Sequence, residues 1–151
     1  MFKLFKKKKH NVVNQTIVSK DGYVFINRNG ESIKVKGTNV SISNDKIYID
    51  GKLYKSDFEP EKNTIYNITI NGNVNKIESN GDVIVNGNAN DFIEANGDVT
   101  INGDHKLGSI SAGGDIVVDG NNTGNIFAGG DVIVKKNNEG NISSGGDVCI
   151  K

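Results

Sequence analysis

Five aspartates that each follow a glycine come closest, by type and spacing, to forming a chemical site. They lie 16 or 17 residues apart and are Asp82, Asp98, Asp115, Asp131 and Asp147. Glycine–aspartate repeats bind Ca²⁺ between the coils of some β-rolls, but those repeats have a nine-residue period and place the aspartate differently. We therefore expect each carboxylate to bond to the backbone of its own turn, and we expect no metal.

The other residues with catalytic potential are few and scattered. His10 follows a run of lysines, and His105 lies in the one repeat with an extra residue, where we expect a bulged corner. Cys149 is the only cysteine, which excludes an internal disulfide and fits a reducing compartment. Because the repeats carry no inserted loops, the sequence predicts no enzymatic activity and no cofactor.

The first nine residues mix apolar and basic side chains in a pattern typical of membrane-surface attachment. Each lysine near an anionic leaflet contributes about 1 kcal/mol, and aromatic side chains add to this by insertion. The alternative is a solvated, disordered end. The residues predicted to bind the membrane are Phe2, Lys3, Leu4, Phe5, Lys6, Lys7, Lys8 and Lys9.

The net charge of the chain and the hydropathy of its N-terminus limit the cellular locations and the binding partners to be expected. The tail holds five of the 18 basic residues, so the remaining chain has 13 basic against 18 acidic residues, a net charge of about −5. Nucleic acid is therefore not an expected partner of the folded part. The apolar run at the N-terminus is too short for a signal peptide or a membrane span. We expect a cytoplasmic protein, peripherally attached at the inner face of the cytoplasmic membrane.

The elements that position the aspartates are predicted from a repeat of apolar residues in the same register. Apolar residues two apart flank each turn, as expected for short strands with alternate residues facing inward. The predicted core forms three columns, which are Ile77, Ile93, Ile110, Ile126 and Ile142; Val83, Val99, Ile116, Val132 and Val148; and Val85, Ile101, Val118, Val134 and Ile150. A column of small residues accompanies the first and comprises Ser79, Ala95, Ala112, Ala128 and Ser144.

This pattern predicts an all-β protein whose main part is a short parallel β-solenoid, or β-helix. The composition agrees, with 19 glycines, one proline and no tryptophan. The solenoid is expected over residues 67–151, with 16 to 17 residues per coil and about five coils. Residues 16–58 are expected to form an antiparallel β-meander whose last hairpin turns at Asp50-Gly51. Residues 59–66 are the predicted linker, and residues 1–15 the predicted disordered, basic membrane-targeting tail.

Two features of the solenoid predict association. The outward residues of one strand per coil are largely apolar where a solvated face should be polar, and this predicted lateral interface comprises Ile84, Thr100, Val117, Ile133 and Cys149. It is covered either by the meander of the same chain or by another copy. The sequence also runs to Lys151 within a rung, and the open strand edges favour end-to-end stacking.

The repeat and the tail resemble the bactofilins, a family of bacterial cytoskeletal proteins. The resemblance rests on segments such as Thr123-Gly-Asn-Ile-Phe-Ala-Gly-Gly-Asp-Val-Ile-Val134 and on the start Met1-Phe-Lys-Leu-Phe-Lys-Lys-Lys-Lys9. It implies a β-helix that polymerises end to end without nucleotide on the cytoplasmic face of the membrane.

The sequence therefore leaves two candidate functions. The first is a scaffold that self-assembles through its β-solenoid, with itself and an anionic membrane surface as partners. The alternative is a binding module, such as a phage accessory or tail-associated protein, that forms a small closed oligomer. Such a module would bind a ligand or a protein through the meander or the apolar residues of the lateral interface.

Overall fold

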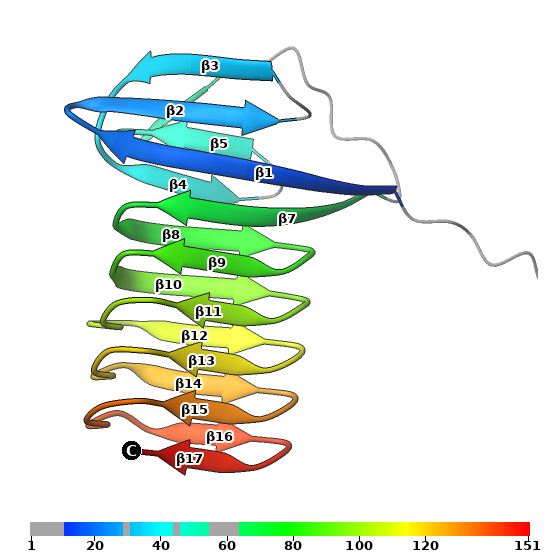
Figure 1. Ribbon diagram of the computed structural model, residues 1–151, viewed down its shortest axis with the longest axis vertical. Helices are drawn as coiled ribbons and strands as arrows, with labels where there is room; N and C mark the ends of the chain where they lie inside the picture. The colour runs from blue at the N-terminus through cyan, green and yellow to red at the C-terminus, as the bar shows by residue number, and fades with distance from the viewer. Residues whose placement is uncertain (1–10, 29–30, 44–45, 55–63) are drawn as a thin grey trace, which may run out of the picture.

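The computed structural model describes residues 11–28, 31–43, 46–54 and 64–151, and within these ranges every regular element is a β-strand (Figure 1). The predicted membrane-binding residues and most of the predicted linker lie outside the described residues. The strands are β1 (Asn11–Lys20), β2 (Tyr23–Arg28), β3 (Glu31–Lys36), β4 (Val40–Ser43), β5 (Lys46–Ile49), β6 (Lys52–Leu53), β7 (Thr64–Asn71), β8 (Val74–Ser79), β9 (Val83–Asn86), β10 (Ala89–Ala95), β11 (Val99–Ile101), β12 (Ser109–Ala112), β13 (Ile116–Val118), β14 (Asn125–Ala128), β15 (Val132–Val134), β16 (Ile142–Ser144) and β17 (Val148–Ile150).

The strands form two sheets that face each other along a rod. A nine-stranded sheet has the order β17-β15-β13-β11-β9-β7-β1-β2-β3, and an eight-stranded sheet has the order β16-β14-β12-β10-β8-β4-β5-β6. Strands from β7 to β17 alternate between the two sheets and pair in parallel, so this part is a parallel β-solenoid of about five turns, as predicted. Figure 1 shows the coils stacked below the antiparallel strands, with the C-terminus at the far end.

The predicted columns are confirmed by the strand register. Val83 pairs with Val99, Val99 with Ile116, and Ile116 with Val132, so each column member lies next to its counterpart in the adjacent coil. Like residues stack in the second sheet as well, where Ile110 pairs with both Ile93 and Ile126. The column members of the inner coils are fully buried and form one continuous core. Stacked columns stabilise coils that could not bury an apolar face alone.

The antiparallel strands at the head do not form a separate meander beside the solenoid. β1 pairs in parallel with β7, and β4 pairs in parallel with β8, so the head extends both solenoid sheets. Residues 11–15, predicted to be disordered, belong to β1, and residues 64–66, predicted as linker, belong to β7. Ile17 is fully buried and belongs to the same hydrophobic core as the solenoid, and Gln15 on the same strand is buried as well.

The predicted hairpin at Asp50-Gly51 is present between β5 and β6. Asp50 and Gly51 both have positive φ, which suits the tight turns that twist with the strands. The Asp50 carboxylate accepts hydrogen bonds from the backbone N–H groups of Asn39 at 2.9 Å and Thr38 at 3.1 Å. These donors favour the charged form and lower the pKa of Asp50. The hairpin is thereby tied to the connection that precedes β4.

Candidate assembly interface

The last coil, β16 and β17, exposes side chains that are buried in every inner coil. Val148 is 49% exposed and Ile150 is 50% exposed, although their counterparts in β15 are fully buried. Ile142 is only partly buried. The prediction that Val148 and Ile150 belong to the buried core was therefore wrong for the single chain, whereas Ile142 still packs against the core. Among the described strands, β17 pairs only with β15 and β16 only with β14, whereas each inner strand of the solenoid has a neighbour on both sides.

The same coil presents backbone groups that inner coils use to bond to the next strand. In β15, the Val132 N–H donates to the Asp147 carbonyl at 2.8 Å, and the Val134 carbonyl accepts from the Lys151 N–H at 3.0 Å. The equivalent groups are the N–H of Val148 and the carbonyl of Ile150, which no described strand pairs. An unpaired edge of this kind is a ready site for another strand. We call the surface of Ile142, Val148, Ile150 and these strand edges the open end.

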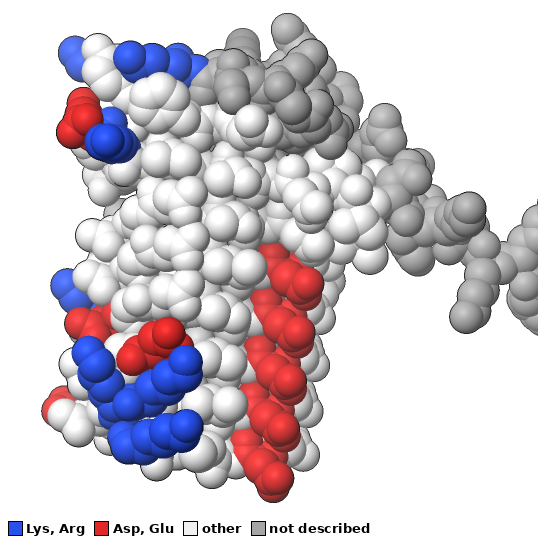
Figure 2. Space-filling view, in the orientation of Figure 1, with Lys and Arg blue, Asp and Glu red and all other residues white. Residues whose placement is uncertain are grey.

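The aspartates of the glycine–aspartate pairs join neighbouring coils instead of closing their own turns. The Oδ1 atom of Asp115 accepts a hydrogen bond from the backbone N–H of Asp131 at 2.8 Å, and Asp131 accepts from Asp147 at the same distance. The prediction of a bond within the turn was therefore wrong. We call the set of Asp82, Asp98, Asp115, Asp131 and Asp147 the aspartate ladder, and Figure 2 shows acidic side chains as a stripe along one edge of the rod.

The glycine before each aspartate leaves the space that this bond needs. A Cβ atom on Gly130 would lie 2.0 Å from the Asp115 Oδ1, and one on Gly146 would lie 2.0 Å from the Asp131 Oδ1. No side chain can occupy that position while the carboxylate reaches the backbone of the next coil. The Gly-Asp pair is thus explained by stacking, and among the described residues no group of three His, Cys, Asp or Glu side chains could hold a metal.

A second set of hydrogen bonds runs inside the rod and involves His105. His105 is fully buried and forms β-bridges with Ala89 and Asn122, so the expected bulged corner is instead an interior position. The amide of Asn122 donates to the Gly124 carbonyl at 2.9 Å and to the Oδ1 of Asn138 at 2.6 Å. Its oxygen therefore accepts from His105 Nδ1, at 2.5 Å. Sequence spacing missed this chain because a histidine, His105, stands where the next two coils have Asn122 and Asn138.

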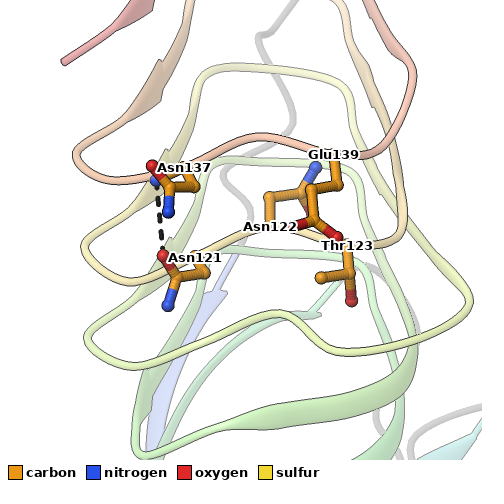
Figure 3. Close-up of a pocket in the computed structure, with 5 residues that line it drawn as sticks. All are labelled: Asn121, Asn122, Thr123, Asn137 and Glu139. Atoms are coloured by element: carbon orange, nitrogen blue, oxygen red, sulfur yellow. Dashed lines mark hydrogen bonds between the residues drawn. The ribbon is translucent and has the colours of Figure 1, made fainter.

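A small polar cavity of about 200 Å³ adjoins this chain of hydrogen bonds at Asn122 (Figure 3). Its lining consists of Asn121, Asn122, Thr123, Asn137 and Glu139. The backbone N–H of Asn137 donates to the Oδ1 of Asn121 at 3.3 Å, which is the same coil-to-coil bond that the aspartates make. The lining has one acidic side chain, its hydroxyl group on Thr123 donates to the Lys106 carbonyl, and its asparagines are engaged in stacking the coils.

The predicted lateral interface lies on the outer face of the nine-stranded sheet. Ile84 is 40% exposed, Cys149 is exposed, and Thr100, Val117 and Ile133 are partly buried. The head strands β1 to β3 continue this sheet edge to edge and do not fold over it. The alternative in which the meander covers these residues is therefore wrong for the described part of the chain.

The described residues form a parallel β-solenoid of about five turns with antiparallel strands at one end, and none of the described strands pairs with the outer side of β16 or β17. No family model matches the chain, and no curated protein or solved structure is significantly similar to it. Within the described ranges, no helix is long and apolar enough to cross a membrane.

Proposed function

We propose that this protein is a structural scaffold that assembles through the ends of its β-solenoid. The observation that carries the proposal is the open end, where Val148 and Ile150 are half exposed beside strand edges that no described strand pairs. The basic and apolar tail at residues 2–9 would tether the assembly to an anionic membrane surface on the cytoplasmic side. No enzymatic activity is part of this proposal.

The free energy of the end-to-end contact can be estimated from the side chains and backbone groups that it would bury. Fully burying a Val or Ile side chain contributes about 1.5–3 kcal/mol, so the half-exposed Val148 and Ile150 have roughly half of that left to gain. Association costs an estimated 4–15 kcal/mol, which two such side chains per copy do not offset alone. The backbone hydrogen bonds of both strand edges are therefore needed, and any group that holds the edges apart should abolish assembly.

The resemblance to bactofilins supports the same proposal, because it implies a β-helix that polymerises end to end. The resemblance rests on the repeat and the tail, and none of the comparisons names that family. The proposal therefore depends first on the geometry of the open end.

Replacing Ile150 with lysine should abolish assembly, because the charge would have to be buried between two coils. We expect filaments much longer than one rod for the full-length protein in negative-stain electron microscopy, with matching light scattering. The Ile150→Lys variant should give only monomers or small closed species. Leu107→Lys is the matched control, since Leu107 is 68% exposed and lies away from the open end.

A chain that lacks residues 1–10 separates assembly from membrane attachment. It should still form filaments but should no longer sediment with vesicles that contain phosphatidylserine. Discrete small particles from the full-length protein at every salt concentration would contradict end-to-end assembly.

One observation favours the second candidate, a binding module that closes laterally into a small oligomer. No described segment folds over the outer residues Ile84, Thr100, Val117, Ile133 and Cys149, and apolar surface of this kind commonly marks an interface. A closed oligomer would be disrupted by Ile84→Lys and would be indifferent to Ile150→Lys. The same microscopy therefore distinguishes the two candidates.

A further inference from the structure

The outer face of the nine-stranded sheet carries three columns of side chains with different chemistry. The central column is largely apolar and comprises Thr69, Ile84, Thr100, Val117, Ile133 and Cys149. The aspartate ladder forms one edge. The other edge comprises Asn86, Asn102, Asp119, Lys135 and Lys151, in which Lys135 Nζ bonds to Asp119 Oδ1 at 2.8 Å. Figure 2 shows the acidic stripe at one edge and lysines near the other, at the C-terminal end.

We propose that two copies of this chain pair through this face with their rods parallel, about a two-fold axis that runs along the rods. Such an axis places each residue of the central column opposite its own copy in the partner. It also exchanges the two edges, so that the aspartate ladder of one copy faces the edge with the lysines of the other. The occupant of the face is thus a second copy of the same chain.

The charges select this orientation. In a parallel pair, Lys135 lies in the same coil as Asp131 and Lys151 lies in the same coil as Asp147, so each lysine meets an aspartate of the partner. Asp119 lies in the same coil as Asp115 and meets one like charge, but it is itself bonded to Lys135. In an antiparallel pair, the two-fold axis crosses the rods and places one aspartate ladder against the other. Like charges brought together at an interface cost several kcal/mol, so the antiparallel pair is disfavoured.

The size of the face makes this contact weak by itself. Five strand spacings of about 4.8 Å and a three-residue strand of about 10 Å give roughly 240 Å² per copy. A stable interface buries about 1,200–2,000 Å² in total, several times more than this pair. Its strength therefore rests on the proposed assembly, in which many copies along two filaments make the contact together. The parallel orientation of the two rods, by contrast, follows from the charges at the edges of the face and does not depend on that assembly.

Disulfide trapping tests the pair. In a Cys149→Ser background, Ile84→Cys places a thiol on the proposed axis, far from the open end. Mild oxidation should give a covalent dimer at a yield about tenfold or more above that of Leu107→Cys, the matched exposed control. A mixture of tagged Ile84→Cys and Ile133→Cys chains should not favour the mixed dimer.

Two results would overturn the proposal. The first is a dimer yield from Ile84→Cys no higher than that from Leu107→Cys, and the second is a preference for the mixed dimer, which indicates antiparallel rods.

Adding Ile150→Lys to the Ile84→Cys chain separates this proposal from end-to-end assembly. Filaments without the Ile84→Cys dimer refute the lateral pair alone. A dimer that persists in concentrated Ile150→Lys protein, when the full-length protein forms no filaments, supports the pair and refutes only the end-to-end contact.

Discussion

Replacing Ile101 with alanine should lower the free energy of unfolding by about 2–5 kcal/mol. Ile101 is fully buried and stacks between Val85 and Val118 in the adjacent coils. Its truncation leaves a cavity in the middle of a continuous column, and strands fixed by hydrogen bonds on both sides cannot close around it. Urea unfolding followed by circular dichroism measures the loss.

The matched control is Ile150→Ala, which makes the same change in the same column. Ile150 is 50% exposed in the last coil, so its truncation should cost the dissociated protein less than about 1 kcal/mol. Equal losses at the two positions in the dissociated protein would mean that Ile150 is already covered in a single copy. That result would contradict the open end.

Gly129→Ala should destabilise the protein by about 3 kcal/mol or more, although it adds a single methyl group. A Cβ atom on Gly129 would lie 2.2 Å from the backbone oxygen of Gly113 in the preceding coil. The adjacent coils are held together there, since the Gly129 N–H donates to the Ala112 carbonyl at 3.0 Å. The methyl group can be accommodated only by separating two coils, which breaks backbone hydrogen bonds. Thermal melting would detect the change.

Gly22→Ala controls for the general effect of replacing a glycine. Gly22 has a φ of 74°, and a Cβ atom there would meet nothing within 4 Å. The change should therefore cost only the backbone strain of alanine in the left-handed region, about 1–2 kcal/mol. A loss at Gly129 no larger than that at Gly22 would argue against close stacking of the coils.

The solenoid could be predicted from the sequence because each coil repeats its neighbour. When Val83, Val99 and Ile116 recur at the coil length, parallel stacking in register is the arrangement that buries all of them together. The pairing of β1 with β7 could not be predicted in this way. It joins residues 11–18 to residues 64–71, which share no repeat, and hairpin signals specify only pairing between neighbours in the sequence.

The candidate interface was predicted in part for a similar reason. A column pattern identifies Val148 and Ile150 as equivalents of buried residues, but burial also requires a coil on each side. The prediction for the aspartates was wrong because turn chemistry favours bonds within the turn, whereas the carboxylates from Asp82 to Asp131 bond to the next coil. Only the three-dimensional stack places that N–H within reach.

Hydrogen exchange at the open end is the most direct test of end-to-end assembly. In inner coils, the N–H groups of Ile126 and Val132 bond to the next strand, whereas their equivalents at Ile142 and Val148 face no described strand. We predict that the amides of Ile142 and Val148 exchange rapidly in dilute, dissociated protein and become protected in filaments, while those of Ile126 and Val132 are protected in both. Equally fast exchange at Ile142 and Val148 in both states would contradict assembly through this end.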